Sequence, residues 1–285
     1  MLEYEENNYK IQKFNSLLEA AVYLESLQDL YKYSLTQKST LGREKSWYGA
    51  GSFSEVLDKL RNGDKVQTLE YISNLKELNN FNERDTDFYR DVEGFTYDMY
   101  SVVEGEPECC INSGAPEPHK TLEIHIDIGY SGAVKGSTIN NRGFAIVNLI
   151  NTLISKGYIL DVYVVHYITT DCGLNCAHLF KINTETLTLS TLAYTTTCSF
   201  FRVVSWLLTA IQIKRYDYNG EGCSQPSCSM LKKLKQQNIL YIPSGYTDNR
   251  LNSCSKSEAQ ALVNEYYNSF IKENARKVVI ETYYS

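Results

Sequence analysis

The hydrophobic positions in the middle of the chain follow two patterns, one typical of buried strands and one typical of a helix. Residues 121–127 (TLEIHID) and 159–167 (ILDVYVVHY) are short runs rich in apolar and β-branched residues, which indicates strands. Between them, apolar positions from Arg142 to Ile154 recur at near-helical spacing, and Lys156-Gly157 is a helix stop signal. The order strand, loop, helix, strand predicts a crossover unit with two parallel neighbouring strands.

Helix start and stop signals place most of the other elements. Capping boxes at Ser16, Ser52 and Ser255, each with a glutamate three residues on, predict helix N-termini. Residues 91–107 are expected to form a strand pair or an extended cover over the sheet, and the polar residues 1–14 a loose lead-in. Helices are predicted near residues 16–27, 52–62, 65–78, 195–212 and 258–273. Strands are predicted at 177–183, returning antiparallel as a hairpin, and at 238–243.

These elements predict an α/β fold, with a Rossmann-like, mostly parallel sheet flanked by helices. Gly114, Pro116 and Pro118 mark the boundary before the core because glycine and proline interrupt regular structure. We therefore expect a helical N-terminal extension or subdomain over residues 1–115 and an α/β core over residues 116–285.

Composition and charge narrow the functional classes. The 285 residues are 43% hydrophobic, which is enough for a sizeable core, and the formal charge of −6 gives no bulk attraction to nucleic acid. The longest apolar run, 198–213, contains Arg202 and Gln212 and is too short to span a bilayer. The acidic N-terminus lacks the apolar region of a secretion signal. We therefore expect a cytoplasmic protein without a membrane contact, whose eight cysteines are thiols.

The predicted strand ends supply candidates for a binding edge, because ligands of such sheets meet the carboxyl ends of the strands, where loops gather. Arg142, inside the predicted helix, is expected to pair with Glu123 or with a neighbouring loop. The candidates at the strand ends and in the loops after them are Asp127, Gly129, Ser131, Thr169, Thr170, Asp171, Ser244 and Asp248.

The sequence shows no recognisable catalytic set. Nucleophilic catalysis needs a positioned base, but two of the four histidines fall inside predicted strands and none is in a nucleophile motif. The loop 129–138 lacks the Gly-Lys-Ser/Thr ending of a nucleotide-hydrolysing phosphate loop. A zinc site could draw its ligands from Cys172, Cys176 and His178, with Cys223, Cys228 and Cys254 further along the chain, but their spacing is weak evidence. Free or packed side chains are the ordinary alternative.

Four blocks of the sequence are informative when taken together. They are residues 47–63 (WYGAGSFSEVLDKLRNG), 94–109 with its Gly-Glu-Pro-Glu-Cys ending, 126–165 with Asn-Arg-Gly-Phe-Ala-Ile-Val-Asn-Leu, and 186–202. In combination they resemble an uncharacterised family of proteins encoded by bacteriophages and plasmids. The resemblance implies a core similar to the von Willebrand factor A-type α/β fold, and a bacterial host cell.

The resemblance also bears on a metal site. A complete site of that fold needs Asp-x-Ser-x-Ser after the first strand and further oxygen ligands from later loops, because Mg²⁺ prefers near-octahedral oxygen coordination. Here the loop reads Asp127-Ile-Gly-Tyr-Ser131, so Gly129 replaces the first serine, and residues 243–245 bring no immediate aspartate. The resemblance therefore implies a degenerate loop, in which Asp127 and Ser131 are the candidate Mg²⁺ ligands and a purely structural carboxylate is the alternative; no other cofactor is expected.

Three functional hypotheses stay open. The leading one is a non-enzymatic binding protein that contacts a protein partner through the loop edge of the α/β core. The second is a single-stranded nucleic-acid binder of phage replication or transcription, in which some of the 23 tyrosines stack bases while Lys214, Arg215, Lys232, Lys233 and Lys235 contact phosphates. The third is a metal-dependent adhesion-type or hydrolytic module.

Overall fold

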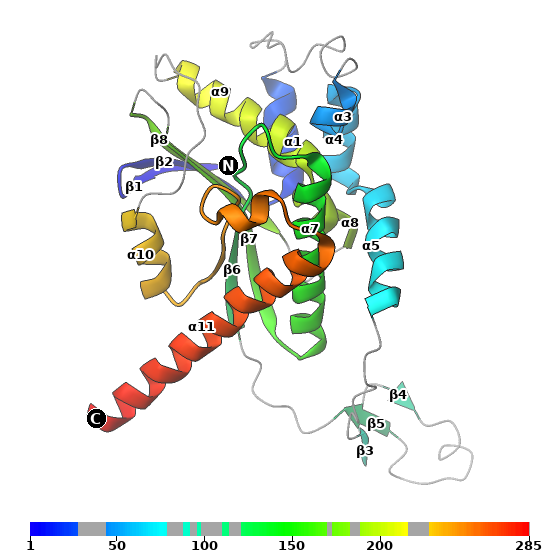
Figure 1. Ribbon diagram of the computed structural model, residues 1–285, viewed down its shortest axis with the longest axis vertical. Coiled ribbons are helices and arrows are strands. Elements are labelled where there is room, and N and C mark those ends of the chain that lie inside the picture. The colour runs from blue at the N-terminus through cyan, green and yellow to red at the C-terminus, as the bar shows by residue number, and fades with distance from the viewer. Residues whose placement is uncertain are drawn as a thin grey trace. The chain divides into compact units, whose positions relative to one another are not determined.

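The chain forms two compact units in a computed structural model, which describes residues 1–27, 44–78, 88–91, 96–97, 110–113, 121–169, 173–182, 189–215 and 228–284 (Figure 1). The first unit comprises Met1–Ile72 and Thr121–Ser285, and the second comprises Ser73–Lys120. In the second unit, β3 (Phe88–Asp91), β5 (Cys110–Ser113) and β4 (Thr96–Tyr97) form a small antiparallel sheet in that order. Of the stretch expected as a strand pair, most of 92–107 lies outside the described residues.

The first unit is built on a mixed sheet of six strands in the order β1-β2-β8-β7-β6-β9. The pairs β2–β8, β6–β7 and β6–β9 are parallel, whereas β1–β2 and β7–β8 are antiparallel. The strands are β1 (Leu2–Glu6), β2 (Tyr9–Phe14), β6 (Thr121–Asp127), β7 (Ile159–Thr169), β8 (Asn175–Ile182) and β9 (Leu240–Ile242). The α/β class, the parallel pairing of β6 with β7 and the antiparallel return of β8 are confirmed.

The prediction for the N-terminus was wrong. Residues 1–14 are not a lead-in to a helical extension but a hairpin, in which Leu2 pairs with Lys13 and β2 continues the main sheet beside β8. Asn7 and Asn8 form the turn with φ of 50° and 65°, the left-handed conformation that two-residue hairpin turns require and that asparagine tolerates. The Asn-Asn pair and the alternation of Tyr9 and Ile11 were the available signals.

The helices follow their start and stop signals closely. Ser16 and Ser52 accept hydrogen bonds from the backbone N–H groups of Glu19 and Glu55, 3.1 and 3.2 Å away, as the capping boxes predicted. The helices are α1 (Leu17–Ser26), α3 (Lys45–Tyr48), α4 (Phe53–Asn62), α5 (Lys65–Leu78), α7 (Gly136–Ser155), α8 (Leu189–Thr195), α9 (Trp206–Arg215), α10 (Cys228–Gln236) and α11 (Lys256–Tyr284), with a π-helix, η2 (Phe200–Ser205), and a 3₁₀-helix, η3 (Asn249–Asn252).

Three helices differ from their predicted extent. Helix α11 continues to Tyr284 rather than ending near Glu273. Helix α7 begins at Gly136 rather than at Arg142, because the glycine, serine and threonine residues of its first turn have low helix propensity and resemble a loop. The helix expected over 195–212 is divided into the end of α8, the π-helix η2 and α9, so one turn in its middle is widened. Its apolar side chains are buried, as predicted for a helix packed deep against the sheet.

The two faces of the main sheet pack against different elements because side chains alternate along each strand. On one face Phe180 packs edge-on against Phe200 of η2, with ring centroids 5.0 Å apart. On the other face a cluster that includes Val165 and Leu179 packs against Met230 and Leu234 of α10. The sheet therefore has a core on each side.

A pair of histidines lies in the core on the η2 face. His166 of β7 and His178 of β8 are cross-strand partners and neither is exposed. The hydroxyl of Ser205 hydrogen-bonds Nδ1 of His166, and the hydroxyl of Thr209 lies 3.4 Å from Nε2 of His178. Burial lowers the pKa of His166 to about 3, and burial followed by the charge of His166 lowers the pKa of His178 well below its usual value. These histidines are packed core residues, as expected for His178.

This pair predicts loss of stability in mild acid. A histidine in the unfolded chain titrates near pH 6.5, so between that pH and about 3 the unfolded state binds more protons than the folded state. The free energy of unfolding should therefore fall as the pH drops below 6.5, by about 1.4 kcal/mol per pH unit for each histidine. Urea denaturation at pH 7, 6 and 5 measures it, and Trp47 and Trp206, the only tryptophans, report on the first unit alone. His166→Gln should flatten the slope, whereas an equal slope in this variant would contradict the assignment.

Candidate functional site

Strand β6 ends in Asp127, whose carboxylate is buried and held by protein donors. Its Oδ1 accepts the backbone N–H of Gly129 at 3.0 Å and its Oδ2 accepts the hydroxyl of Tyr241 at 2.6 Å. Only 1% of Asp127 is exposed. Burial raises the pKa of this carboxyl, and the hydrogen bonds together with the charge of Arg142 oppose that rise. Asp127 thus fixes the start of the loop and presents no surface to a partner.

The guanidinium of Arg142 reaches back from α7 to the carboxyl ends of two strands. Its Nη2 donates to the carbonyl oxygens of Asp127, Ile242 and Pro243 at 2.8, 3.1 and 2.7 Å. Of the two partners predicted for Arg142, the neighbouring loop is the one that it contacts, through backbone carbonyls. The other, Glu123, contacts Nε2 of His125 at 2.8 Å. A buried positive charge joins the ends of β6 and β9 to the helix that follows β6.

The residues at this strand end do not fit a Mg²⁺ ion. Both carboxylate oxygens of Asp127 are already hydrogen-bonded, and Arg142 supplies a cation beside them. A side chain at Gly129 would be crowded, because a Cβ there would lie 3.2 Å from the ring of Tyr246. Among the described residues no cluster of three or more His, Cys, Asp or Glu side chains is placed to hold a metal. Ser131 is half-buried, and its hydroxyl accepts the backbone N–H of Ala133.

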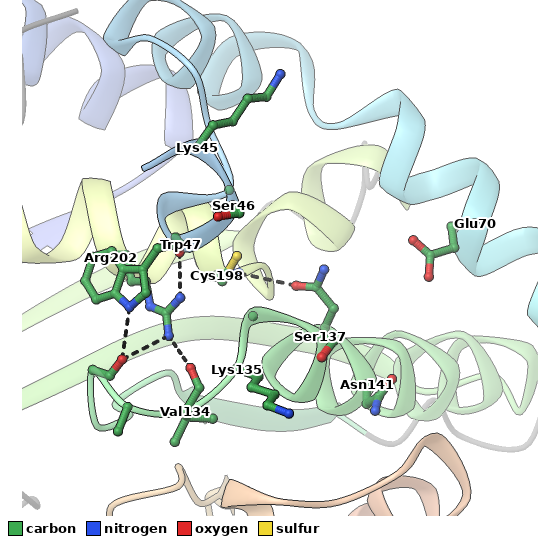
Figure 2. A pocket seen from close by; sticks show the side chains of 15 residues that line it. Lys45, Ser46, Trp47, Glu70, Val134, Lys135, Ser137, Asn141, Cys198 and Arg202 are labelled. Atoms are coloured by element: carbon green, nitrogen blue, oxygen red, sulfur yellow. Dashed lines mark hydrogen bonds between the residues drawn. The ribbon is translucent and has the colours of Figure 1, made fainter. Parts of the chain in front are cut away.

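A wide cavity of about 1250 Å³ opens beside the loop that follows β6 (Figure 2). Its walls come from α3, from residues 132–135, from the first turns of α7, and from Cys198 and Arg202. Arg202 is 1% exposed and lies over the indole of Trp47, with 4.3 Å between its guanidinium carbon and the ring centre. The same guanidinium donates to the carbonyl of Trp47 at 2.5 Å and to the carbonyl of Val134. It therefore ties α3 to the loop after β6.

The cavity and the role of Arg202 were not predicted from the sequence. The arginine was noted only because it interrupts an apolar run. A lone cation inside a helix that is otherwise apolar was the available signal, since a buried charge needs a polar partner. The contribution of Trp47, whose Nε1 donates to the carbonyl of Gly132 at 3.1 Å, had no recognisable signal because the two residues are far apart in sequence.

The other predicted edge residues lie in different surroundings. Ser244 is buried, and Thr169 donates to the side chain of Asn175 at 2.8 Å. Asp248 caps η3 and binds Arg250 and the hydroxyl of Tyr266, at 2.7 and 2.9 Å, and the arginine lowers the pKa of Asp248. Thr170 and Asp171 lie outside the described residues. Of the described ones, Thr169, Ser244 and Asp248 do not line the large cavity.

Two of the five basic residues predicted to contact nucleic acid form ion pairs with glutamates of β1. Arg215 pairs with Glu3 at 2.5 Å, and Lys233 pairs with Glu6. Lys214 and Lys232 are exposed, and the side chain of Lys235 lies outside the described part of the chain. Many described tyrosines are core residues rather than surface platforms; the buried ones are Tyr9, Tyr48, Tyr71, Tyr130, Tyr163, Tyr167 and Tyr194.

Three described cysteines, Cys176, Cys198 and Cys254, are buried free thiols. Burial raises the pKa of Cys198 and of Cys254. Within the ranges that the structure describes, no helix is long and apolar enough to cross a membrane.

The fold and this edge define an α/β protein with a mixed six-stranded sheet and a wide cavity at the carboxyl end of β6. The model of one family, described as a domain of unknown function (DUF7192), matches residues 5–270. The chain therefore belongs to the DUF7192 family. No curated protein and no solved structure matches the chain.

Replacing Arg142 tests whether it supports this edge. Arg142→Met would leave the buried carbonyls of Asp127, Ile242 and Pro243 without this donor, so the free energy of unfolding should fall by about 2–3 kcal/mol or more. Urea denaturation followed by tryptophan fluorescence measures the change. Arg61→Met is the matched control, because Arg61 makes a more exposed ion pair with Glu25 and should matter little. Equal effects of the two substitutions would show that the carbonyl contacts are unimportant.

Added Mg²⁺ should leave the protein's melting temperature unchanged relative to NaCl of the same ionic strength. The reason is that the oxygens of Asp127 already accept protein donors and Arg142 lies nearby. Differential scanning fluorimetry of the wild type and of Asp127→Asn provides the measurement. A rise that is specific to Mg²⁺ and disappears in Asp127→Asn would instead establish a metal site.

Proposed function

We propose that the protein is a non-enzymatic binding protein that holds a protein partner at the cavity beside the β6–α7 loop. The observation that carries this proposal is the cavity itself, with a volume of about 1250 Å³. Pockets for small molecules commonly enclose about 300–1,000 Å³ and bury most of their ligand. A larger, open hollow at the loop edge of a sheet suits a protruding segment of another protein better.

The walls of the cavity are held in place before a partner arrives. Arg202 connects Trp47 of α3 to the carbonyls of Gly132 and Val134, and Trp47 itself donates to Gly132. Asn140 of α7 accepts the backbone N–H of Cys198 at 3.4 Å. A preformed surface loses less conformational freedom on binding, which favours affinity.

Among the described residues, two groups that could serve in catalysis are placed unsuitably for it. The Ser205 and His166 pair lies in the core, where a substrate has no access, and the pKa of His166 is lowered to about 3. Cys198 lines the cavity, but its raised pKa favours the thiol over the nucleophilic thiolate. These observations support binding rather than covalent chemistry.

The finer assignment of the fold and the source is part of the same proposal. A von Willebrand factor A-like core is supported by the order strand β6, loop beginning at Asp127, helix α7 and parallel strand β7. In that interpretation the metal-site loop is degenerate and has become a structural support. A phage or plasmid origin and a place in a bacterial cytoplasm rest on the sequence resemblance alone.

A bulky side chain at the cavity mouth tests the proposed function. Ala133 lines the cavity and is exposed, so Ala133→Trp should obstruct the partner without disturbing the core. Wild type, this variant and the matched control Ala261→Trp, on an exposed position of α11, serve as bait in host or infected-cell lysate. Quantitative mass spectrometry should show a protein retained by the wild type and the control and lost with Ala133→Trp.

The proposal fails if Ala133→Trp and the wild type retain the same proteins. Fluorescence anisotropy with labelled single-stranded DNA, at low and moderate salt, addresses the alternative in the same preparations. Saturable, salt-sensitive binding that is unaffected by Ala133→Trp but weakened by Lys232→Gln would favour the nucleic-acid hypothesis instead.

A further inference from the structure

The cavity contains a buried cation that forms no ion pair with any described residue. Arg202 donates to three backbone carbonyls, those of Trp47, Gly132 and Val134, and its Nε has no hydrogen-bond partner. Burial lowers the pKa of this guanidinium. A desolvated charge satisfied only by neutral acceptors leaves a positive potential at the wall of the cavity, because carbonyl dipoles do not neutralise it.

The N-terminus of α7 opens on the same cavity. The helix is 20 residues long, and Lys135 precedes it without a side-chain hydrogen bond that caps the first turn. Gly136 and Ser137 line the cavity, and their backbone N–H groups have no acceptor among the described residues. A Cβ at residue 136 would lie 3.1 Å from the sulfur of Cys198, so glycine lets this first turn approach the η2 wall. Free N–H groups at a helix start bind anions well.

Two further cations reach this cavity. Lys135 and Lys45 are exposed, line it, and make no ion pair with a described residue. Figure 2 shows Lys135 beside Ser137 at the start of α7, while the side chain of Lys45 extends away from them. Glu70 is the acidic residue of the lining, and it already contacts Gln67 at 3.0 Å and Lys256 at 3.8 Å. In a chain with a formal charge of −6, this is a local positive site.

We propose that the cavity contains a subsite for a phosphate monoester dianion, held by Lys135, by the N–H groups of Gly136 and Ser137, and by the charge of Arg202. A phosphate combines a double negative charge with several acceptor oxygens, which matches a cation beside two N–H donors at the start of a helix. The inference rests on the proposed function, since it names the group that the occupant of the same cavity presents. That group belongs either to a phosphorylated side chain or to a free phosphate ester, and the experiment separates the two.

The test titrates the full chain with inorganic phosphate, AMP and a phosphoserine peptide, each against chloride at matched ionic strength. Tryptophan fluorescence is a direct readout because Trp47 lines the cavity, and the melting temperature is the second readout. Saturable binding of phosphate is expected. Lys135→Gln should weaken it about tenfold, which corresponds to the loss of one charge-assisted hydrogen bond, and Lys45→Gln should weaken it less. Lys156→Gln, the same change at the exposed opposite end of α7, should leave it unchanged.

Each outcome bears on the inference. Tighter binding of the phosphoserine peptide than of phosphate and AMP identifies the source as a phosphorylated side chain, and the reverse identifies a free ester. The inference is overturned if no ligand gives a saturable signal, or if Lys135→Gln and Lys156→Gln behave alike. If phosphate binds but Ala133→Trp retains the same lysate proteins as the wild type, the subsite is supported and the proposed function is contradicted. If Ala133→Trp loses a protein that the wild type retains but phosphate does not bind, the proposed function is supported and the subsite is contradicted.

Discussion

The contact of Arg142 with three backbone carbonyls is the constraint on which the functional edge depends. The backbone carbonyls of Asp127, Ile242 and Pro243 lie at the carboxyl ends of β6 and β9, and buried carbonyls need hydrogen-bond donors. Arg142 fulfils this need with one nitrogen, at 2.7–3.1 Å from all three oxygens. Because the arginine is on α7, the same contact sets the distance between the helix and the strand ends. The loop between them, with Asp127 at its start, then has little freedom.

Two buried arginines follow the same principle at neighbouring places. Arg142 binds the ends of β6 and β9, and Arg202 binds α3 and the loop after β6. Both donate to carbonyl oxygens rather than to carboxylates. Satisfying a cation with dipoles leaves its net charge in place, whereas a buried ion pair would cancel it. Arg202 therefore keeps a positive charge beside the cavity although the chain is acidic. At Arg142 the positive charge is close to Asp127; at Arg202 it faces the cavity.

Much of the fold was predictable because local signals and tertiary packing agree. Ser16 and Ser52 cap helices where the capping boxes predicted them, and β6 and β7 have the continuous apolar character of strands buried on both faces. The hairpin of residues 1–14 was missed because β1 is an exposed edge strand with little apolar content, so only its Asn-Asn turn carried information. The cavity opens beside the loop after β6, which is one of the three loops named as the candidate edge. However, Asp127 and Ser244 proved to be buried supports, and Arg202 and Trp47 come from segments whose meeting no local pattern encodes.

The π-helix η2 shows how the core and the edge are linked. Arg202 and Ser205 are three residues apart, and in a regular helix such residues lie on nearly the same face. Here Arg202 contacts Trp47 and the loop at the cavity, while Ser205 bonds His166 inside the sheet core. A widened turn changes the angle between successive side chains, which lets one short segment serve both environments. The same π-helical segment thus packs into the core through Ser205 and holds the cation at the cavity through Arg202.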